Sequence, residues 1–192
     1  DVVTAPDGSL MVADWYDPGV GGHNMRDLDR GRLFLVAPES HKYKAPKLDV
    51  SGIEGAITAL KSPNEASRYL AWHAIHKLGK KAEPALQKLF ADTNPRIRAR
   101  ALWLLGKIGG RGQHYVDLAI KDKDPDIRLV GLRLARQLAD VKAIEVVEKL
   151  VSDKSAQVRR ECAIALRHLN TEQAAKLWAE LATRHDGEDR WY

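Results

Sequence analysis

One seven-residue phrase recurs along this chain and limits the folds that the chain can adopt. It reads DTNPRIR at 92–98, DKDPDIR at 122–128 and DKSAQVR at 153–159, at intervals of 30 and 31 residues, with a weaker copy, SPNEASR, at 62–68. Apolar residues around the phrase recur with the same period and are spaced three and four apart, as on one face of a helix. A unit of this size cannot bury such a stripe alone, so the units must stack side by side.

Each repeat is predicted to form a helix, a short turn and a second helix. The second helix has a start signal in every copy, because an N-cap residue type stands at the same place, and Pro95 and Pro125 occupy the first helical position. Cys162 occupies a position that holds a small residue in every copy, so we expect a buried and unreactive thiol. The predicted N-caps are Asn64, Asn94, Asp124 and Ser155.

An arginine lies four residues after each cap, in the first helical turn, where the helix dipole disfavours a cation. An aspartate six residues upstream is the expected partner, either within a repeat or between neighbouring repeats, and this would give a ladder of charge-assisted hydrogen bonds along the stack. The first copy has Ser62 in place of the aspartate, so the ladder should be weakest there. The predicted ladder consists of Asp92, Arg98, Asp122, Arg128, Asp153 and Arg159.

The pattern D-x-x-P-x-I/V-R followed by A-x-x-x-L-x-x-L/I resembles HEAT repeats, especially the short HEAT-like repeats of phycobilisome lyases. The resemblance covers residues 53–182 and implies a mainly α protein, an α-solenoid that serves as a protein-binding scaffold without chemistry of its own. We expect four and a half repeats over 53–192. The segment 171–182 matches a first helix, and the closing HDGEDRWY only begins a second one, so the fifth pair is expected to be truncated.

The opening residues are typical of strands. DVVTAPDGSLMVADWY predicts two strands around a Pro-Asp-Gly turn, and GRLFLVAP predicts a third. We therefore predict a small three-stranded antiparallel β segment over 1–37 and a linker over 38–52. Because three strands alone are marginally stable in water, we expect them to belong to a larger sheet.

The combination of APDGSLMVADWYD and RGRLFLVAP resembles the last, here partial, blade of a β-propeller of the glucose or sorbosone dehydrogenase type. With the repeats that follow, it is similar to large membrane-bound dehydrogenases of planctomycetes, which join a propeller to HEAT-like repeats and often to a c-type haem domain. The resemblance implies a dehydrogenase as parent protein, pyrroloquinoline quinone or c-type haem as its cofactor, and a periplasmic or extracytoplasmic location. This chain has no C-x-x-C-H motif, so we expect no cofactor and no turnover of its own.

The candidate site is the loop DPGVGGHNMRDLDR at 17–30. In propellers of this type the loop between the second and third strands lies on the face that carries ligand sites, so the resemblance places four of its residues near a ligand. Carboxylates suit a hard cation and histidine suits a metal or a proton. The alternative is a surface loop, since no spacing matches a calcium-binding motif. The four residues are Asp17, His23, Arg26 and Asp27.

Other residues are weaker candidates for chemistry. His73 and His76 lie three apart on one predicted helix, but no third ligand stands at metal-binding spacing, and one cysteine excludes a multi-cysteine site. We therefore expect no metal site. The tryptophans of the apolar stripes are expected in the core or in grooves rather than stacked on bases; they are Trp72, Trp103 and Trp178.

Three classes of function stay open. The first is a scaffold for another protein or for a neighbouring domain of the same polypeptide. The second is a piece of a quinone-dependent sugar oxidoreductase that contributes the site loop. The third is nucleic-acid binding, which the net charge of +5 favours and the interleaved acidic residues disfavour, so nucleic acid is not the expected partner. No apolar stretch reaches the roughly 18 residues that a membrane helix needs. The basic residues that would line a nucleic-acid groove are Arg100, Lys107, Arg111, Arg133, Arg136, Arg160 and Arg167.

Overall fold

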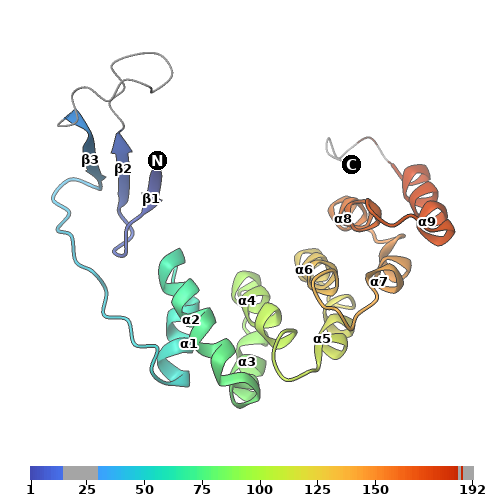
Figure 1. Ribbon diagram of the computed structural model, residues 1–192, viewed down its shortest axis with the longest axis horizontal. Helices are drawn as coiled ribbons and strands as arrows, with labels where there is room; N and C mark the ends of the chain where they lie inside the picture. Colours follow the sequence, from blue (N-terminus) through green and yellow to red (C-terminus); the bar gives the residue numbers. More distant parts are fainter. Residues whose placement is uncertain (15–29, 186, 188–192) are drawn as a thin grey trace. The chain divides into compact units, whose positions relative to one another are not determined.

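The computed structural model describes residues 1–14, 30–185 and 187, and it divides into two compact units, residues 1–74 and 75–192. The described residues form a small antiparallel sheet followed by helices (Figure 1). The chain is thus mainly helical, an α-solenoid with a three-stranded β segment at its start, which confirms the predicted fold class. Within the described ranges, no helix combines the length and apolar character that crossing a membrane requires.

The sheet of the first unit has the strand order β1-β2-β3, and both pairs are antiparallel. Val12 in the central strand pairs with Val2 on one side and with Phe34 on the other. The turn after β1 passes through Gly8, whose φ of 91° favours glycine, as the Pro-Asp-Gly sequence predicts. The strands are β1 (Val2–Thr4), β2 (Leu10–Asp14) and β3 (Arg32–Val36).

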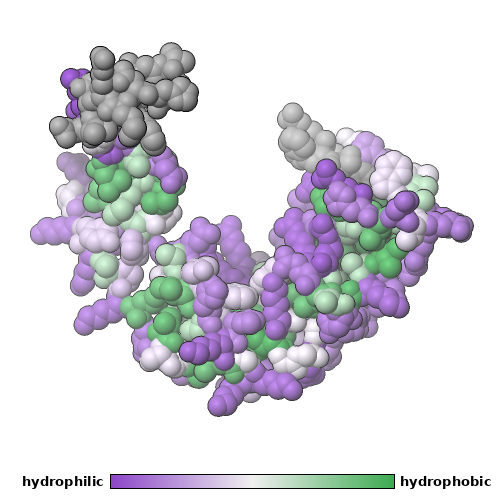
Figure 2. Space-filling view, in the orientation of Figure 1, coloured by the Kyte–Doolittle hydropathy of each residue, from purple (hydrophilic) through white to green (hydrophobic). Residues whose placement is uncertain are grey.

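Apolar side chains on both faces of this sheet are exposed. Successive residues of a strand point to opposite faces, and the exposed residues of β3 are consecutive. Leu33 is 70% exposed and its neighbour Phe34 is 44% exposed. Figure 2 shows apolar side chains gathered over these strands. Among the described residues, neither face of the sheet is therefore buried in the way that normally stabilises an antiparallel sheet in water.

Asp7 fixes the turn of the hairpin to the segment that follows the sheet. Its Oδ1 accepts hydrogen bonds from the Ser9 hydroxyl at 2.6 Å and from the Ser9 backbone N–H at 3.1 Å. Its Oδ2 lies 2.7 Å from Nε2 of His41. The hydrogen bond from the Ser9 hydroxyl has the largest effect in lowering the pKa of Asp7, and the hydrogen bond with His41 lowers this pKa further. Asp7 is therefore ionised, and its contact with His41 joins the hairpin turn to a residue 34 positions later in the chain.

Asn64 links the hairpin to the first helical pair, α1 (Ile53–Lys61) and α2 (Glu65–Leu78). Its amide Nδ2 donates to the carbonyl oxygen of Ala5 at 2.7 Å, and its Oδ1 accepts from the backbone N–H of Ser67 at 3.0 Å. The second bond confirms Asn64 as a cap. The first bond shows that the β segment is held by the repeat that follows it.

The second unit is a stack of helix pairs. In each pair the first and second helices pack on one another, and the second helices α4, α6 and α8 also pack in succession, so that they form one layer (Figure 1). The core between the layers holds fully buried side chains, including Leu86, Leu104, Val116 and Val147. The helices are α3 (Glu83–Phe90), α4 (Pro95–Leu105), α5 (Gly112–Ala119), α6 (Pro125–Ala135), α7 (Ala143–Leu150), α8 (Ala156–Leu166) and α9 (Glu172–Thr183), and the short 3-10 helix η2 (Gly79–Ala82) precedes α3.

The predicted helix starts are confirmed in position. Asn94 and Asp124 accept hydrogen bonds from backbone N–H groups of the first turn, and a proline follows each at the first position. Ser155 is the N-cap of α8, as predicted, and its side chain makes no capping bond. The small-residue position is confirmed by Gly131, where an added Cβ would come within 2.7 Å of the Ala119 Cβ.

Candidate functional site

The predicted ladder joins each repeat to the next. Arg98 on α4 donates to the carboxylate of Asp122, and Arg128 on α6 donates to Asp153 through Nε and Nη2, both at 2.7 Å. Arg128 also donates through Nη1 to the backbone carbonyl of Asp122 in its own repeat, at 2.9 Å. Each arginine therefore binds a carboxylate of the following repeat and a carbonyl of its own turn or preceding helix. The sequence left open whether the aspartate partner lies in the same repeat or in the next one, and in these two pairs the carboxylate belongs to the next repeat.

The aspartates of the ladder have a second role in their own turns. The carboxylates of Asp92, Asp122 and Asp153 each accept the backbone N–H two residues later, at 2.8 to 2.9 Å. Burial raises the pKa of Asp153, but the hydrogen bonds from Arg128 and from the Ser155 N–H outweigh it and leave the pKa below its ordinary value. The bond to Asp153 in turn raises the pKa of Arg128 against the effect of burial. Both groups are charged, and the side chains are 14% and 8% exposed.

The ladder changes at its C-terminal end. In the first copy, Arg68 donates to the backbone carbonyls of Ser62 and Pro63, the same contacts that Arg128 makes in its own turn. Arg159 is buried and donates to the carbonyl of Arg184 at 3.4 Å and to that of Asp153 at 2.9 Å. Arg184 stands one period after Asp153, in the place of a ladder aspartate. In the described part of the second unit, the arginine–carboxylate pairs of the ladder are thus Arg98–Asp122 and Arg128–Asp153. These pairs hold successive repeats together.

A second ionic link was not predicted. Glu161 on α8 is 3% exposed, and it accepts from Arg133 at 2.8 and 3.0 Å and from Arg136 at 3.0 Å. The available signal was that Glu161 stands where the preceding copy has the apolar Val130. A buried carboxylate in such a place requires cationic partners on the neighbouring repeat.

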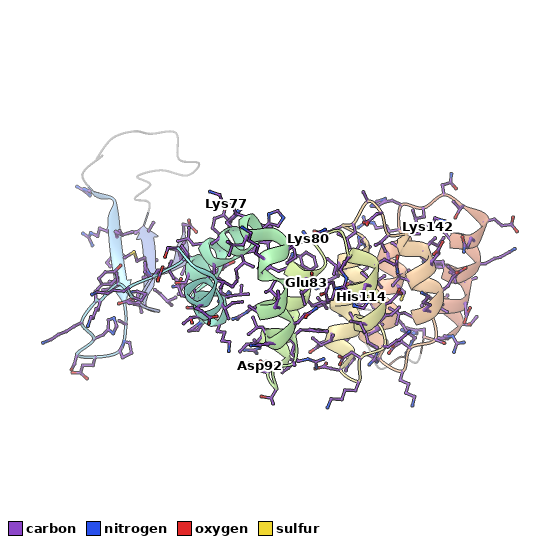
Figure 3. All side chains as sticks on the ribbon, turned by 90° about the horizontal axis from the view of Figure 1, so that it is seen from below. Lys77, Lys80, Glu83, Asp92, His114 and Lys142 are labelled. Carbon is purple, nitrogen blue, oxygen red and sulfur yellow. The ribbon has the colours of Figure 1, made fainter. Side chains whose placement is uncertain are left out.

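The first helices carry a third polar cluster. The hydroxyl of Tyr115, on α5, donates to Glu83 on α3, and Arg111 donates to the same carboxylate at 2.8 Å. The bond from Tyr115 is the largest cause that lowers the pKa of Glu83, while burial raises the pKa of Tyr115. Gln87 donates to the Tyr115 hydroxyl at 3.0 Å. Figure 3 labels Glu83 and the nearby His114. The cluster joins two repeats through a protonated tyrosine and resembles the ladder in this role.

A groove of about 850 Å³ is lined by α8, α9 and the turn between them. Its lining is mainly apolar, and three large side chains in it are exposed: Trp178 by 58%, Ile164 by 41% and Leu169 by 41%. Arg160, Arg167 and His185 line the same groove. Trp178 is therefore a groove aromatic, whereas Trp103 is half-buried under Nζ of Lys107 at 4.7 Å. The groove can accept an apolar segment and offers cations beside it.

The predicted site loop cannot be compared with the structure, because Asp17, His23, Arg26 and Asp27 lie outside the described residues. His73 packs edge-on against Tyr69, with ring centroids 4.4 Å apart. Among the residues that the structure places, no group of three or more His, Cys, Asp or Glu side chains could hold a metal ion.

Cys162 lies in the core of its repeat, as the small-residue position predicts. It is fully buried, and burial raises the pKa of its thiol to about 12. A thiol that stays protonated is a poor nucleophile. The predicted inert cysteine is therefore confirmed.

The basic residues proposed for a nucleic-acid groove do not form one surface. Arg133 and Arg136 bind Glu161, and Arg111 binds Glu83 on the first-helix side. Lys107 donates to Gln137 at 2.7 Å. Arg160 and Arg167 line the groove between α8 and α9. These basic residues are thus divided between polar contacts that join neighbouring repeats and the lining of the groove.

Two comparisons with known proteins match the helical part. The family of HEAT repeats matches residues 53–118 and 112–191. A solved structure, the complex of CpcE and CpcF of phycocyanin lyase from Nostoc sp. PCC7120, is 20% identical to this chain, with a TM-score of 0.50 over 74% of this chain and 92% of that one. At this identity the likeness concerns the fold alone. No curated protein matches, and neither match bears on the propeller resemblance of residues 1–37.

Proposed function

The chain belongs to the HEAT-repeat family, and from this premise we propose that it is a scaffold that binds another protein through its helical stack. The observation that carries the proposal is the ladder, in which Arg98 and Arg128 fix α4 and α6 to the repeat that follows each. Ion pairs with this geometry hold the helices at defined spacings, so their exposed side chains form a preorganised surface.

The charge of the second helices indicates the kind of partner. Arginine outnumbers acidic residues on α4, α6 and α8 alike. Their acidic side chains are Asp126, in the first turn of α6, and Glu161, which is buried and already paired. An acidic protein surface would complement this layer. The complex of two chains in the solved structure described above also supports a protein partner.

Affinity capture from nuclease-treated extract of the source cells tests the proposal. The immobilised 192-residue chain should retain a defined protein that elutes as salt is raised, because exposed ion pairs are screened. The double variant Arg98→Ala/Arg128→Ala, used at a temperature where it is folded, should retain less of it, and Lys176→Ala, at a lysine of α9 that is 75% exposed and lies outside this layer, serves as the control. Capture that disappears after nuclease treatment would contradict the scaffold and favour nucleic acid.

A second candidate, a contribution to a quinone-dependent sugar oxidoreductase, is favoured by the sheet. Both of its faces expose apolar side chains, which suits a blade flanked by other sheets. In this proposal the parent protein is an extracytoplasmic dehydrogenase, and pyrroloquinoline quinone or c-type haem binds to parts other than this chain. Dye reduction with glucose, quinone and calcium should be undetectable with the 192-residue chain. Turnover that is lost in His23→Ala would instead place an active site in the loop 17–30.

A further inference from the structure

One stripe along α4 and the turn after it combines cations with an aromatic ring. Its residues are spaced four, three and four apart, so they share one side of the helix, whereas buried residues such as Leu105 lie on the other side. The sequence of α4, PRIRARALWLL, contains no acidic residue. The first residue of the stripe is exposed and the other three are partly exposed. This set, which we call the α4 stripe, consists of Arg96, Arg100, Trp103 and Lys107.

The stacking of the repeats does not account for the α4 stripe. The ladder arginine of the same helix, Arg98, recurs in every copy, because it joins one repeat to the next. The α4 stripe does not recur, since the next copy has an acidic, an apolar, a basic and an amide residue in its four places. These residues are Asp126, Val130, Arg133 and Gln137. A charged stripe that one repeat has and the next lacks is better explained by binding than by folding.

Lys107 is held in place before any partner arrives. Its Nζ lies 4.7 Å from the centroid of the Trp103 ring, and it donates to Oε1 of Gln137 at 2.7 Å. Gln137 lies in the turn after α6, so this contact joins two repeats. An ammonium group that is already ordered loses less entropy when it meets a carboxylate. Lys107 and the ring beneath it therefore form a preorganised feature of this surface.

The neighbouring helix decides which part of the α4 stripe is the more positive. In its first turn, α6 has the acidic Asp126, which lowers the positive potential near the N-terminal ends of these helices. Further along α6, Arg133 and Arg136 share the carboxylate of Glu161. Two cations on one carboxylate leave a net positive charge there. The positive charge therefore gathers beside Trp103 rather than at the start of α4.

We infer that the part of the α4 stripe from Arg100 to Lys107 binds an acidic segment of a partner protein. In this complex carboxylates of the segment meet Arg100 and Lys107, and a large apolar side chain packs on Trp103. The two cations are seven residues apart, which is about 10 Å along a helix, so about four residues of extended chain span them. Tryptophan and arginine are typical anchors of protein interfaces. The inference rests on the proposed scaffold function and names one of its contact sites.

The test uses a labelled synthetic peptide of about ten residues, with glutamates on both sides of one phenylalanine. Fluorescence anisotropy should show saturable binding to the 192-residue chain that weakens as salt is raised. A peptide with glutamine in place of glutamate should bind at least about tenfold more weakly, and one with alanine in place of phenylalanine about threefold more weakly. Equal binding of all three peptides, or no binding of the acidic one, would overturn the inference.

Variants of the chain locate the site. Arg100→Glu and Lys107→Glu should each weaken binding about tenfold, whereas Lys176→Glu, at a lysine of α9 that is 75% exposed, should leave it unchanged. Trp103→Leu should also weaken binding, and its matched control is Trp178→Leu, at a tryptophan that is 58% exposed on α9. Circular dichroism verifies that each variant is folded. Unchanged affinity in the folded variants of the α4 stripe would overturn the inference.

A charge exchange separates binding from a general loss of structure. The double variant Arg100→Glu/Lys107→Glu should bind a lysine version of the peptide more tightly than the natural chain does, and a merely destabilised chain would not. Failure of this exchange in the folded variant would overturn the inference.

Nucleic acid and other surfaces of the stack give distinct results. A single-stranded oligonucleotide of the same charge that binds more tightly than the acidic peptide, and is lost in the double variant, would overturn a protein partner at this site. Capture of the cellular partner that persists in the folded double variant would overturn the site but leave the scaffold function standing. Absence of any captured protein with the natural chain would contradict the scaffold function itself.

Discussion

Arg128 holds the carboxylate of Asp153 in a bidentate pair, with Nε 2.7 Å from Oδ2 and Nη2 2.7 Å from Oδ1. The same guanidinium binds the carbonyls of Asp122 and Lys123 at 2.9 and 3.2 Å. One side chain thus ties the turn before its own helix to the turn of the next repeat. Two consequences for stability follow from this arrangement.

Arg128→Ala should lower the free energy of unfolding by about 1–3 kcal/mol, because it leaves the carboxylate of Asp153 and two carbonyls without this donor. Arg128→Lys should recover only part of the loss, since an ammonium group cannot make the bidentate pair. Urea denaturation measures both, with the exposed Arg96→Ala as control. If Arg128→Ala and Arg96→Ala have equal effects, the ladder does not stabilise the stack.

The pair should also make stability depend on acid. The folded-state pKa of Asp153 is lowered, so its contribution is complete above the unfolded value of about 3.9 and is lost as the pH falls through the folded value. We expect the stability difference between the natural chain and Asp153→Asn to be constant from pH 7 to about pH 5 and to shrink below about pH 4. Urea midpoints at pH 7, 5 and 3 measure this. A difference that persists unchanged at pH 3 would contradict it.

The sequence predicted the members of the ladder but left their pairing open. The repeat period shows that Arg128 has aspartates both six residues before it and in the next copy, and only the stacking of α6 on α8 decides which carboxylate it meets. Local signals such as the caps Asn94 and Asp124 were read correctly because they depend on neighbouring residues. The link from Glu161 to Arg133 was missed because it joins residues 28 positions apart through tertiary packing.

Asn64 should anchor the sheet separately from capping α2. In Asn64→Asp the side chain can still accept from the Ser67 N–H but can no longer donate to Ala5, whereas Asn64→Ala loses both bonds. We expect faster hydrogen exchange of the hairpin amides in both variants, and a loss of stability of about 1 kcal/mol or more from the lost cap only in Asn64→Ala. Exchange measured by mass spectrometry over peptides 1–14 and 65–78 separates the two effects. Unchanged exchange over 1–14 would mean that the sheet does not depend on Asn64.

Removing the carboxylate of Glu161 and removing its two arginine partners should lower the stability of the chain by different amounts. Glu161 has a side chain that is 4% exposed, whereas those of Arg133 and Arg136 are 53% and 36% exposed. Removing the carboxylate lets two arginines return to water, but removing both arginines leaves a buried charge. We therefore expect Glu161→Gln to cost about 1 kcal/mol and Arg133→Ala/Arg136→Ala about 3 kcal/mol. Equal losses in urea denaturation would show that Glu161 is hydrated in the folded chain.

Cys162 provides an independent measure of how the ladder holds the stack. Its buried thiol has a pKa raised to about 12, so iodoacetamide at pH 8 should label it only when the repeat opens. Labelling of the folded chain should be slower than in urea by orders of magnitude.

When opening is fast and reversible, the labelling rate follows the population of the open state, so a loss of about 1.4 kcal/mol in Arg128→Ala should accelerate labelling about tenfold. Because α8 carries both Cys162 and Arg159, opening of this helix exposes the thiol directly. Labelling that is as fast in the folded chain as in urea would contradict the buried thiol. A destabilised Arg128→Ala whose labelling rate stays unchanged would show that the helix opens independently of the ladder.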